Sequence, residues 1–296
     1  MGYEVVDAVT HPDRPAARRC THPPPPVKVC AQQHGIPVLQ FERIRRPEGR
    51  EALEALKPDL FVTAAFGQIL SAKVLAIPKL GTINVHASLL PEYRGSAPIN
   101  WCLINGETRT GVTTMMTDIG IDTGDMLLRD EVEIGPDENA EELTERLSRV
   151  GAQTLLRTLK ALENGTLTRT PQDESKSSYQ PMLEKTLGCI DWNKPAQSIH
   201  NLVRGVNPWP GAYTQMESGV LKVWKTALTE QKTDASAGTI VKANGKEGLF
   251  VACGEGVLQI VELQAPGSTR MNARDYLRGK PMQEGAVLGE NRAESE

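Results

Sequence analysis

Asn84 and His86 have the side-chain types that acyl transfer requires, and they lie two residues apart in the chain. They alternate with the apolar residues Ile83 and Val85, which predicts a buried strand. Side chains two apart on a strand share a face, so the amide and the imidazole point the same way, opposite to the apolar pair. In an open α/β sheet, ligands bind at the carboxyl ends of strands. An amide and an imidazole at such a place suit a carbonyl oxygen that becomes negative during reaction.

Asp122 adds a carboxylate that could approach His86. It lies in residues 118–125, Asp-Ile-Gly-Ile-Asp-Thr-Gly-Asp, where Gly120 and Gly124 predict a tight turn. Taken singly, each feature also has an ordinary interpretation, because Asn-x-His can be a satisfied polar pair and Asp beside Gly is common in turns. Together, the three residues predict an acyl-transfer site. In it, Asn84 and a protonated His86 donate to the oxyanion, while Asp122 orients His86 and relays the proton lost by an attacking amine.

The elements that must position these residues alternate between strand and helix as far as residue 165. Apolar runs predict strands at residues 3–10, 37–40, 59–65, 83–86, 111–117, 126–128 and 131–134. Helical spacing predicts helices at residues 27–33, 48–56, 99–104 and 139–162, the last with a capping box formed by Asn139 and Glu142. This order predicts an α/β fold, with a doubly wound, mostly parallel sheet in residues 1–165.

The pattern changes after residue 165. Residues 166–189 are polar and turn-rich, which is typical of a linker. In residues 190–296, an amphipathic helix at 195–206 precedes five short strands at 212–216, 221–227, 238–242, 249–253 and 257–263, and a helix at 272–277 follows them. We therefore expect a second domain that is a small antiparallel β-barrel of the oligonucleotide-binding type.

Composition excludes several classes of protein. The 296 residues are 39% apolar and 24% charged, as in an ordinary globular protein, and the net charge of −4 does not by itself indicate a nucleic-acid partner. The five cysteines are scattered without a Cys-x-x-Cys pair, and the histidines lack companions at ligand spacing, so we expect no disulfide framework and no metal. No apolar run is long enough to span a membrane, and no signal-peptide pattern is present. The sequence thus predicts a cytoplasmic protein with no membrane or protein partner.

The motifs around these residues resemble those of a known family. Asn-Val-His-x-Ser-Leu-Leu-Pro at 84–91, Tyr-Arg-Gly-x-Ala-Pro-Ile at 93–99 and Asp-x-Gly-x-Asp-Thr-Gly-Asp at 118–125 are similar to the signature of the folate-dependent formyltransferases. The resemblance is strongest to members of that family that act on methionyl-tRNA. It continues in residues 12–15 and 25–28 upstream and in Asn-Pro-Trp-Pro (207–210) and Val-Trp-Lys (223–225) downstream, so that it covers nearly the whole chain.

The resemblance implies an activity, a cosubstrate and a partner. It implies transfer of a formyl group from 10-formyltetrahydrofolate to the α-amino group of methionyl-initiator tRNA, for translation initiation, with Asn84, His86 and Asp122 as catalytic residues. Two segments would line the folate pocket, namely Phe66, Gly67, Gln68 and Ile69, and Ser88, Leu89, Leu90 and Pro91. Basic residues of a proline-rich loop and the segment after it would contact the tRNA, namely Arg14, Arg18, Arg19 and Lys28. From composition alone, that loop is also consistent with a solvated surface loop.

The sequence departs from the family at its beginning. Family members carry an earlier strand, a Gly-Thr-Pro loop and a helix before the segment that matches Gly2 and Tyr3. Either the coding sequence starts upstream of Met1 or the chain is a fragment. In a doubly wound sheet the first strand is usually central. We therefore expect unpaired edges on the strand at residues 5–10 and on the strand that carries Asn84 and His86.

Two other functions are consistent with the sequence. The chain could be a formyltransferase that acts on another amine, either a ribonucleotide or an amino sugar. It could also be an inactive, N-terminally truncated RNA-binding protein, in which only the C-terminal domain functions. An assay of formyl transfer separates the second alternative from the first.

Overall fold

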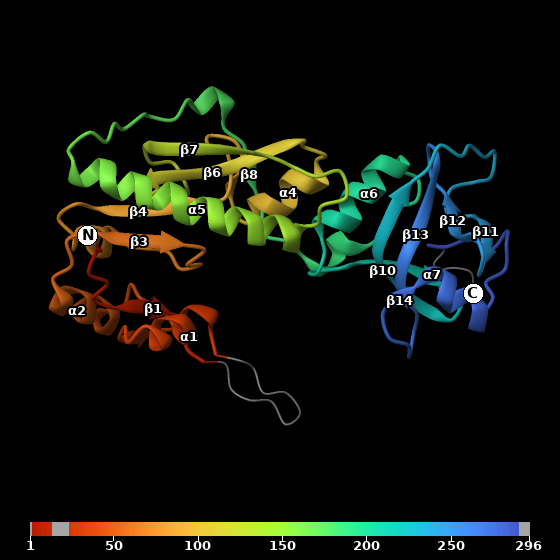
Figure 1. Ribbon diagram of the computed structural model, residues 1–296, viewed down its shortest axis with the longest axis horizontal. Helices are drawn as coiled ribbons and strands as arrows, with labels where there is room; N and C mark the ends of the chain where they lie inside the picture. The colour runs from red at the N-terminus through yellow and green to blue at the C-terminus, as the bar shows by residue number, and fades with distance from the viewer. Residues whose placement is uncertain (1, 14–23, 290–296) are drawn as a thin grey trace. The chain divides into compact units, whose positions relative to one another are not determined.

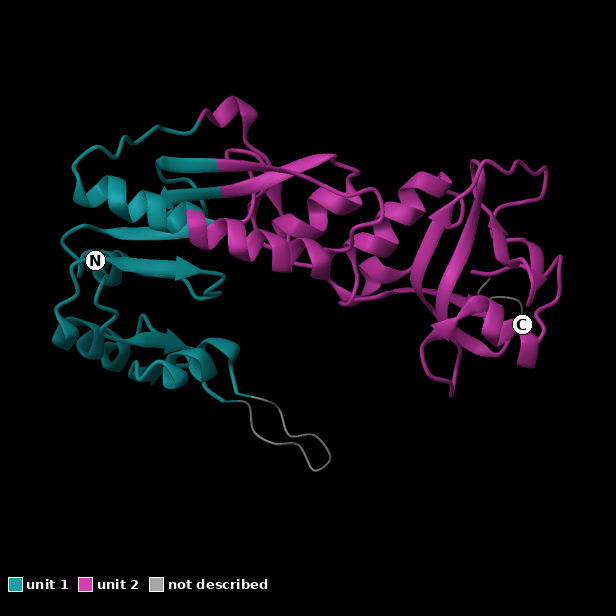
Figure 2. Cartoon of the chain, viewed as in Figure 1, with its two compact units in different colours: residues 1–86, 113–129, 154–172 teal, residues 87–112, 130–153, 173–296 magenta. Residues whose placement is uncertain are grey.

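The computed structural model of the 296-residue chain describes residues 2–13 and 24–289 (Figure 1). The chain divides into two compact units (Figure 2). Unit 1 contains Met1–His86, Thr113–Arg129 and Thr154–Gln172, and unit 2 contains Ala87–Val112, Asp130–Gln153 and Asp173–Glu296. Strands β6 (Arg109–Met116) and β7 (Met126–Glu133) and helix α5 (Ala140–Glu163) each contribute residues to both units.

Unit 1 contains a pair of parallel strands and a mixed sheet. Strand β1 (Ala8–Thr10) is parallel to β2 (Val38–Gln40), and β3 (Phe61–Ala64) is parallel to β4 (Thr82–His86). Strand β6 follows β4 in the order β3-β4-β6-β7 and runs antiparallel to it. The predicted α/β class is confirmed, and the sheet that carries the candidate residues is mixed rather than mostly parallel.

One expectation about strand edges is wrong. Strand β4, which carries Asn84 and His86, is paired on both sides, because β6 returns beside it. Among the described strands of these two sheets, β1 and β2 pair only with each other, and β3 and β7 are the end strands of the mixed sheet. The predicted strand at 3–10 is also shorter than expected: Val5 and Val6 precede β1 and are exposed.

Helices α1 (Pro26–Gln33), α2 (Pro47–Leu56) and α3 (Ala72–Leu75) complete the N-terminal part of unit 1. A small core of Ile44, Leu53 and Val74 joins α2 and α3 to β1 and β3, because Val9 of β1 and Phe61 of β3 pack against it. Removing these apolar side chains from water stabilises this N-terminal part of unit 1. Among residues 2–13 and 24–289, no helix has the length and apolarity to cross a membrane.

Helix α5 begins where its capping box predicts. The Asn139 side chain accepts hydrogen bonds from the backbone N–H groups of Glu141 (2.9 Å) and Glu142 (3.0 Å), and the Glu142 carboxylate accepts from the Asn139 N–H (3.0 Å). These bonds satisfy N–H groups that a helix leaves without partners at its start. In unit 1, Thr158 of α5 hydrogen-bonds Thr114 of β6 at 2.8 Å, which fixes the end of the helix on the sheet.

Unit 2 contains the second core. Helices α4 (Pro98–Ile104) and α6 (Ala196–Gly205) pack together, and α6 contacts the antiparallel sheet. That sheet has the order β11-β12-β13-β10-β9, with β14 (Met271–Asn272) beside β13 and α7 (Ala273–Gly279) following. The bounds of its strands are β9 (Ala212–Met216), β10 (Gly219–Leu228), β11 (Ile240–Asn244), β12 (Gly248–Ala252) and β13 (Val257–Gln264).

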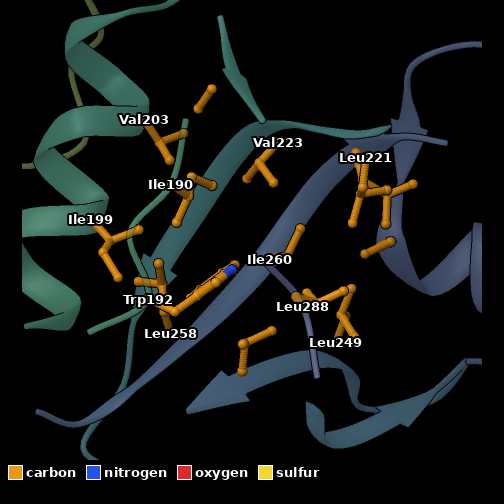
Figure 3. Close-up of a cluster of buried hydrophobic side chains, with 14 of the residues drawn as sticks. Ile190, Trp192, Ile199, Val203, Leu221, Val223, Leu249, Leu258, Ile260 and Leu288 are labelled. Carbon is orange, nitrogen blue, oxygen red and sulfur yellow. The ribbon is translucent and has the colours of Figure 1, made fainter. Parts of the chain in front are cut away.

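Residues 286–289 connect the two end strands of this sheet. Ile240 N donates to Ala286 O (2.8 Å) beside β11, and Gly289 N donates to Gln215 O (2.9 Å) of β9. Inside, branched apolar side chains surround Trp192, whose ring nitrogen donates to Thr214 (3.0 Å) (Figure 3). All five predicted strands and both predicted helices of this region are present, each within about two residues of its expected bounds. The prediction of a small antiparallel domain is confirmed.

The stretch between these regions, residues 166–189, makes specific contacts. Thr170 forms an antiparallel bridge with Met126 in unit 1. In unit 2, β8 (Tyr179–Gln180) is parallel to β5 (Arg94–Gly95). Two single-turn helices, Glu174–Lys176 and Lys185–Gly188, make up part of the remainder. The contact at Thr170 contributes to the geometry of the candidate active site.

Candidate active site

Strand β4 brings Asn84 and His86 to one face of the sheet. They lie opposite Met115 and Thr113 of β6, and the alternation that buries Ile83 completely places both polar side chains on the other face. Thr63 of β3 donates its hydroxyl hydrogen to Asn84 Oδ1 at 2.9 Å. Because the amide oxygen is taken by Thr63, the amide nitrogen is the end of Asn84 that can donate to a third group.

Asp122 completes the group. Its Oδ1 lies 3.5 Å from Asn84 Nδ2 and its Oδ2 lies 3.6 Å from His86 Nδ1. The His86 side chain is 7% exposed and that of Asp122 is 17% exposed. Asp122 has a φ of 54°, in the left-handed region that few non-glycine residues adopt. The structure therefore brings the three predicted residues together, partly shielded from water, with the carboxylate at the limit of hydrogen-bond distance from both partners.

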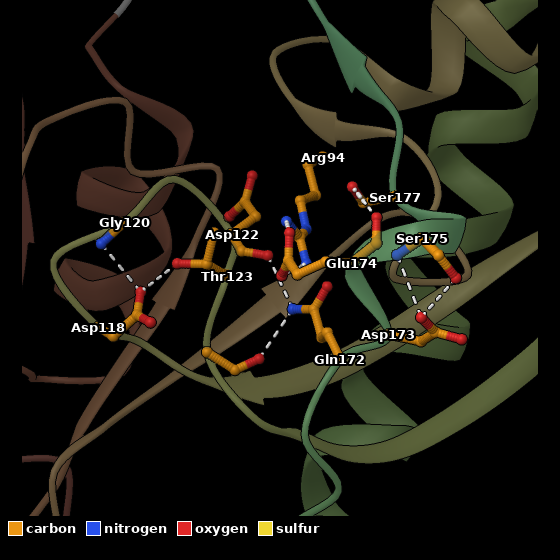
Figure 4. Close-up of polar contacts among 11 residues, drawn as sticks. Arg94, Asp118, Gly120, Asp122, Thr123, Gln172, Asp173, Glu174, Ser175 and Ser177 are labelled. Atoms are coloured by element: carbon orange, nitrogen blue, oxygen red, sulfur yellow. Dashed lines mark hydrogen bonds and ion pairs between the residues drawn. The ribbon is translucent and has the colours of Figure 1, made fainter.

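The turn that carries Asp122 is held at its base and along one side. Met116 N donates to Asp125 O at 2.9 Å, which closes the turn. Asp118 Oδ1 accepts from Gly120 N (3.0 Å) and from the Thr123 hydroxyl (2.7 Å) (Figure 4). Gly124 packs so closely on Met116 that a Cβ there would overlap the Met116 carbonyl oxygen. Of the two glycines predicted to form the turn, Gly124 is thus needed for close approach of backbone to backbone, whereas a Cβ on Gly120 would meet only the Thr123 side chain.

This arrangement has the parts that stabilise a developing oxyanion. Asn84 Nδ2 and an N–H of the His86 ring are donors, and Asp122 is an acceptor that can orient both. A carboxylate beside an imidazole can also take part in moving a proton from an attacking amine. Within residues 2–13 and 24–289, no three His, Cys, Asp or Glu side chains are grouped as metal ligands would be.

Residues 66–69 follow β3 in unit 1. Phe66 packs against the small core, and Gln68 is tied to the backbone, since its amide accepts from Ile44 N (2.7 Å) and donates to Phe41 O (2.8 Å). Gly67 has a φ of 71°, and Ile69 is exposed. Of the four residues, Ile69 therefore offers the most apolar surface to a ligand. Their contact with folate stays a prediction.

Residues 88–91 follow β4 and belong to unit 2. Ser88 and Leu90 are almost fully buried, and the Ser88 hydroxyl donates to Glu92 O at 2.7 Å. The side chains of Leu89 and Pro91 are partly exposed. Any folate bound by this segment would therefore meet the backbone and the side chains of Leu89 and Pro91 rather than those of Ser88 and Leu90.

Of the four basic residues predicted to contact tRNA, Lys28 is the one that the structure describes; Arg14, Arg18 and Arg19 lie outside the described residues. Lys28 Nζ is 2.5 Å from Asp13 Oδ2 and 3.0 Å from Gln40 Oε1. Hydrogen bonds from Lys28 and Gln40 hold the pKa of Asp13 below its usual range. Lys28 is thus paired with the Asp13 carboxylate, and a phosphate would compete with that carboxylate for the ammonium group.

Sequence reasoning missed several residues around the site. Thr63 hydrogen-bonds the Asn84 side chain, and Gln172 hydrogen-bonds the backbone of Asp122. Ile119 and Ile121, in the Asp122 turn, are 82% and 57% exposed. The pairing of β3 with β4 could have pointed to Thr63, which lies directly opposite Asn84. Exposed isoleucines in a polar turn are a signal that sequence does carry, since large apolar side chains at a surface commonly serve binding.

Unit 2 contains a further polar cluster. The Arg94 guanidinium is 7% exposed and makes two hydrogen bonds to Glu174, at 2.9 Å and 2.7 Å (Figure 4). Asp173 caps the short helix that carries Glu174 by accepting from Ser175 N (3.1 Å). These bonds tie Glu174, which lies within the predicted linker, to Arg94 of the Tyr-Arg-Gly motif.

Known families and proteins match most of the chain. The family model for formyl transferases matches residues 1–159, and the model for the formyl transferase C-terminal domain matches residues 182–281. A methionyl-tRNA formyltransferase from Geobacter metallireducens is 52% identical over 288 residues, which covers 97% of this chain and 92% of the relative. One from Ruminiclostridium cellulolyticum is 50% identical over 290 residues, with 97% and 93% covered.

Solved structures show the same fold at lower identity. HypX from Aquifex aeolicus, in complex with tetrahydrofolic acid, superposes with a TM-score of 0.62 at 18% identity, over 88% of this chain and 47% of that chain. An N-formyltransferase from Helicobacter canadensis, in complex with folinic acid and dTDP-3-aminofucose, gives 0.60 at 22% identity, over 78% and 80%. With both family models matched and half of its residues identical to those relatives, the chain belongs to the formyl transferase family.

Proposed function

We propose that this chain transfers the formyl group of 10-formyltetrahydrofolate to the α-amino group of methionyl-initiator tRNA, as a cytoplasmic enzyme of translation initiation. The observation that carries the proposal is the meeting of Asn84, His86 and Asp122 at one end of β4, in a chain that is half identical to methionyl-tRNA formyltransferases along nearly its whole length. No membrane or protein partner is required for this reaction.

Each of the three residues has a defined task. The amine attacks the formyl carbon to form a new C–N bond, which places negative charge on the formyl oxygen. Collapse of this oxyanion breaks the bond between the formyl carbon and the donor's nitrogen, and that nitrogen leaves with the proton that the amine has released. Asn84 Nδ2 donates to that oxygen, since Thr63 already occupies the amide oxygen. His86 is the second donor, and Asp122 orients its ring and accepts the proton that the amine releases. Each donor of this kind is worth about 2.7–4 kcal/mol of transition-state stabilisation.

The formyl donor supplies an activated one-carbon group when it is bound. Within unit 1, residues 66–69 would contact it, with Ile69 as the most exposed apolar side chain. The exposed Ile119 and Ile121 add apolar surface on the Asp122 turn itself. A flat ring system suits such surfaces because its faces are apolar and its edges are polar.

The proposal is tested by assaying formylation of methionyl-tRNA with 10-formyltetrahydrofolate. His86→Ala and Asp122→Ala should each lower kcat by at least about 10²-fold while the protein stays folded. His34→Ala is the matched control, since His34 is exposed just after the C-terminus of α1 and its replacement should leave the rate unchanged. A folded His86 or Asp122 variant with the wild-type rate would remove that residue from the mechanism. If the purified protein formylates an amino sugar or a ribonucleotide but not methionyl-tRNA, the substrate assignment is wrong.

The tRNA contact is tested separately. Replacing Arg14, Arg18 and Arg19 together by alanine should raise KM for methionyl-tRNA and flatten the dependence of that KM on salt, because each phosphate contact contributes about one unit of salt slope. KM for the formyl donor should stay unchanged. Unchanged KM and salt slope for tRNA would show that the loop is only a solvated surface feature.

A further inference from the structure

Gln172 makes two hydrogen bonds to the backbone of the Asp122 turn. Its side-chain nitrogen donates to Asp122 O and to Gly124 O, both at 2.8 Å (Figure 4). A carboxamide nitrogen carries two hydrogens, so one group satisfies two carbonyls that lie two residues apart. The bonds span 50 and 48 residues of sequence and lie entirely in unit 1.

The segment that delivers Gln172 is itself anchored. Thr170 and Met126 exchange backbone hydrogen bonds in both directions, each at 2.9 Å, at the start of β7. Gln172 is two residues beyond this pair, which places its side chain alongside the turn that ends at Asp125. The stretch expected to be a linker therefore contributes a fixed donor to the candidate active site.

The turn is supported by different groups on its two sides. Asp118 holds one side through Gly120 N and the Thr123 hydroxyl. The side that contains the Asp122 and Gly124 carbonyls is held by Gln172. Asp122 itself has left-handed backbone torsions, which are unfavourable for a residue with a Cβ unless its surroundings impose them.

We infer that Gln172 is a positioning residue that fixes the Asp122 carboxylate toward Asn84 and His86. The inference rests on the proposed function of Asp122. Both carboxylate contacts are already long, at 3.5 Å and 3.6 Å, so a small displacement of the turn separates the groups. Misplacement by about 1 Å can lower a catalytic rate about 10²-fold.

The test uses two variants of Gln172 in the full chain. Gln172→Leu removes both N–H donors while keeping a side chain of similar volume. Gln172→Glu replaces the side-chain nitrogen by a carboxylate oxygen, which cannot donate to the two carbonyls. We expect kcat to fall about 10²-fold in both, with KM for the donor and for methionyl-tRNA little changed and the melting temperature lowered no further than the loss of two hydrogen bonds accounts for. Gln33→Leu and Gln33→Glu are matched controls, because Gln33 is exposed on α1. If Gln172→Leu does not fold, Gln172→Asn, which is one methylene too short to reach, provides the same comparison.

A double-mutant cycle distinguishes positioning from a general structural role. If Gln172 acts through Asp122, Gln172→Leu should cause no further loss in an Asp122→Asn background. An additive loss in the double variant, or wild-type kcat in folded Gln172→Leu while Asp122→Asn is impaired, would overturn the inference. Full activity in Asp122→Asn alone is a different result, because it removes Asp122 from the mechanism and the positioning role with it.

Discussion

Replacing Gly124 by alanine tests the candidate site without touching any of its functional groups. A Cβ built on Gly124 would be 1.9 Å from the Met116 carbonyl oxygen, whereas real Cβ atoms essentially never approach within 3.0 Å. The backbone on one side must therefore move by about 1.1 Å. Met116 is fixed in β6 between its neighbours, so the turn is the part that yields. Gly124 is not in the left-handed region, so the effect is steric and not a matter of backbone torsion.

The displacement falls on Asp122, two residues away. Its contacts to Asn84 and His86, at 3.5 Å and 3.6 Å, would lengthen beyond any hydrogen bond if the turn moves outward by that amount. We expect kcat/KM for formyl transfer to fall about 10²-fold, which corresponds to about 2.7 kcal/mol of transition-state stabilisation.

The assay compares steady-state formylation by Gly124→Ala and Gly120→Ala, with thermal melts of both. Gly120 lies in the same turn, but a Cβ there meets the side chain of Thr123, which can rotate away. Gly120→Ala should therefore lose at most the Thr123–Asp118 hydrogen bond, about 1 kcal/mol of stability, and keep most of its activity. Wild-type kcat/KM in folded Gly124→Ala would refute the reasoning that the geometry of the turn sets the rate.

Three further predictions concern stability. Burial lowers the pKa of His200, so on acidification the unfolded state binds a proton at a higher pH than the folded state does. The melting temperature should therefore fall as the pH drops below about 6.5, and His200→Gln should make it depend less on pH. Hydrogen bonds from Arg94 lower the pKa of Glu174, so Glu174→Gln should melt below wild type at neutral pH, and the two should converge as the pH falls below the ordinary glutamate value of 4.5. Strand β3 has an open edge beside the exposed Val62, so Val62→Lys should reduce light scattering on heating without lowering the melting temperature; equal scattering would contradict this.

Much of the fold could be predicted because local signals and tertiary structure agree. Helix α5 begins at its capping box, and the strands of unit 2 follow the alternation of apolar residues between turn-forming glycines. The placement of Asn84 and His86 on one face followed from the period of a strand. The pairing of β4 with β6 did not follow, because strand order depends on contacts far apart in sequence, and the edge expected on β4 was therefore wrong.

The contacts that shape the candidate site were less predictable. Gln172 reaches the site by a single side chain from a segment with no periodic signal, and Thr63 reaches it through the pairing of β3 with β4, which the periodicity of either strand does not specify. A glutamine in a polar, turn-rich stretch looks like any solvated linker residue. The bridge between Met126 and Thr170 fixes the backbone two residues before Gln172, and such a bridge of one residue pair leaves no pattern in the sequence.

The conformation of Asp122 shows why such distant contacts are needed. A left-handed residue with a Cβ costs about 1–2 kcal/mol, which a glycine at that position would avoid, but a glycine has no carboxylate to offer His86. Each of the two hydrogen bonds from Gln172 contributes about 0.5–1.5 kcal/mol, so together they offset a cost of that size. The site thus combines a chemically necessary residue in an unfavourable backbone conformation with a distant amide that stabilises that conformation. The role of that amide can be recognised only in the folded chain.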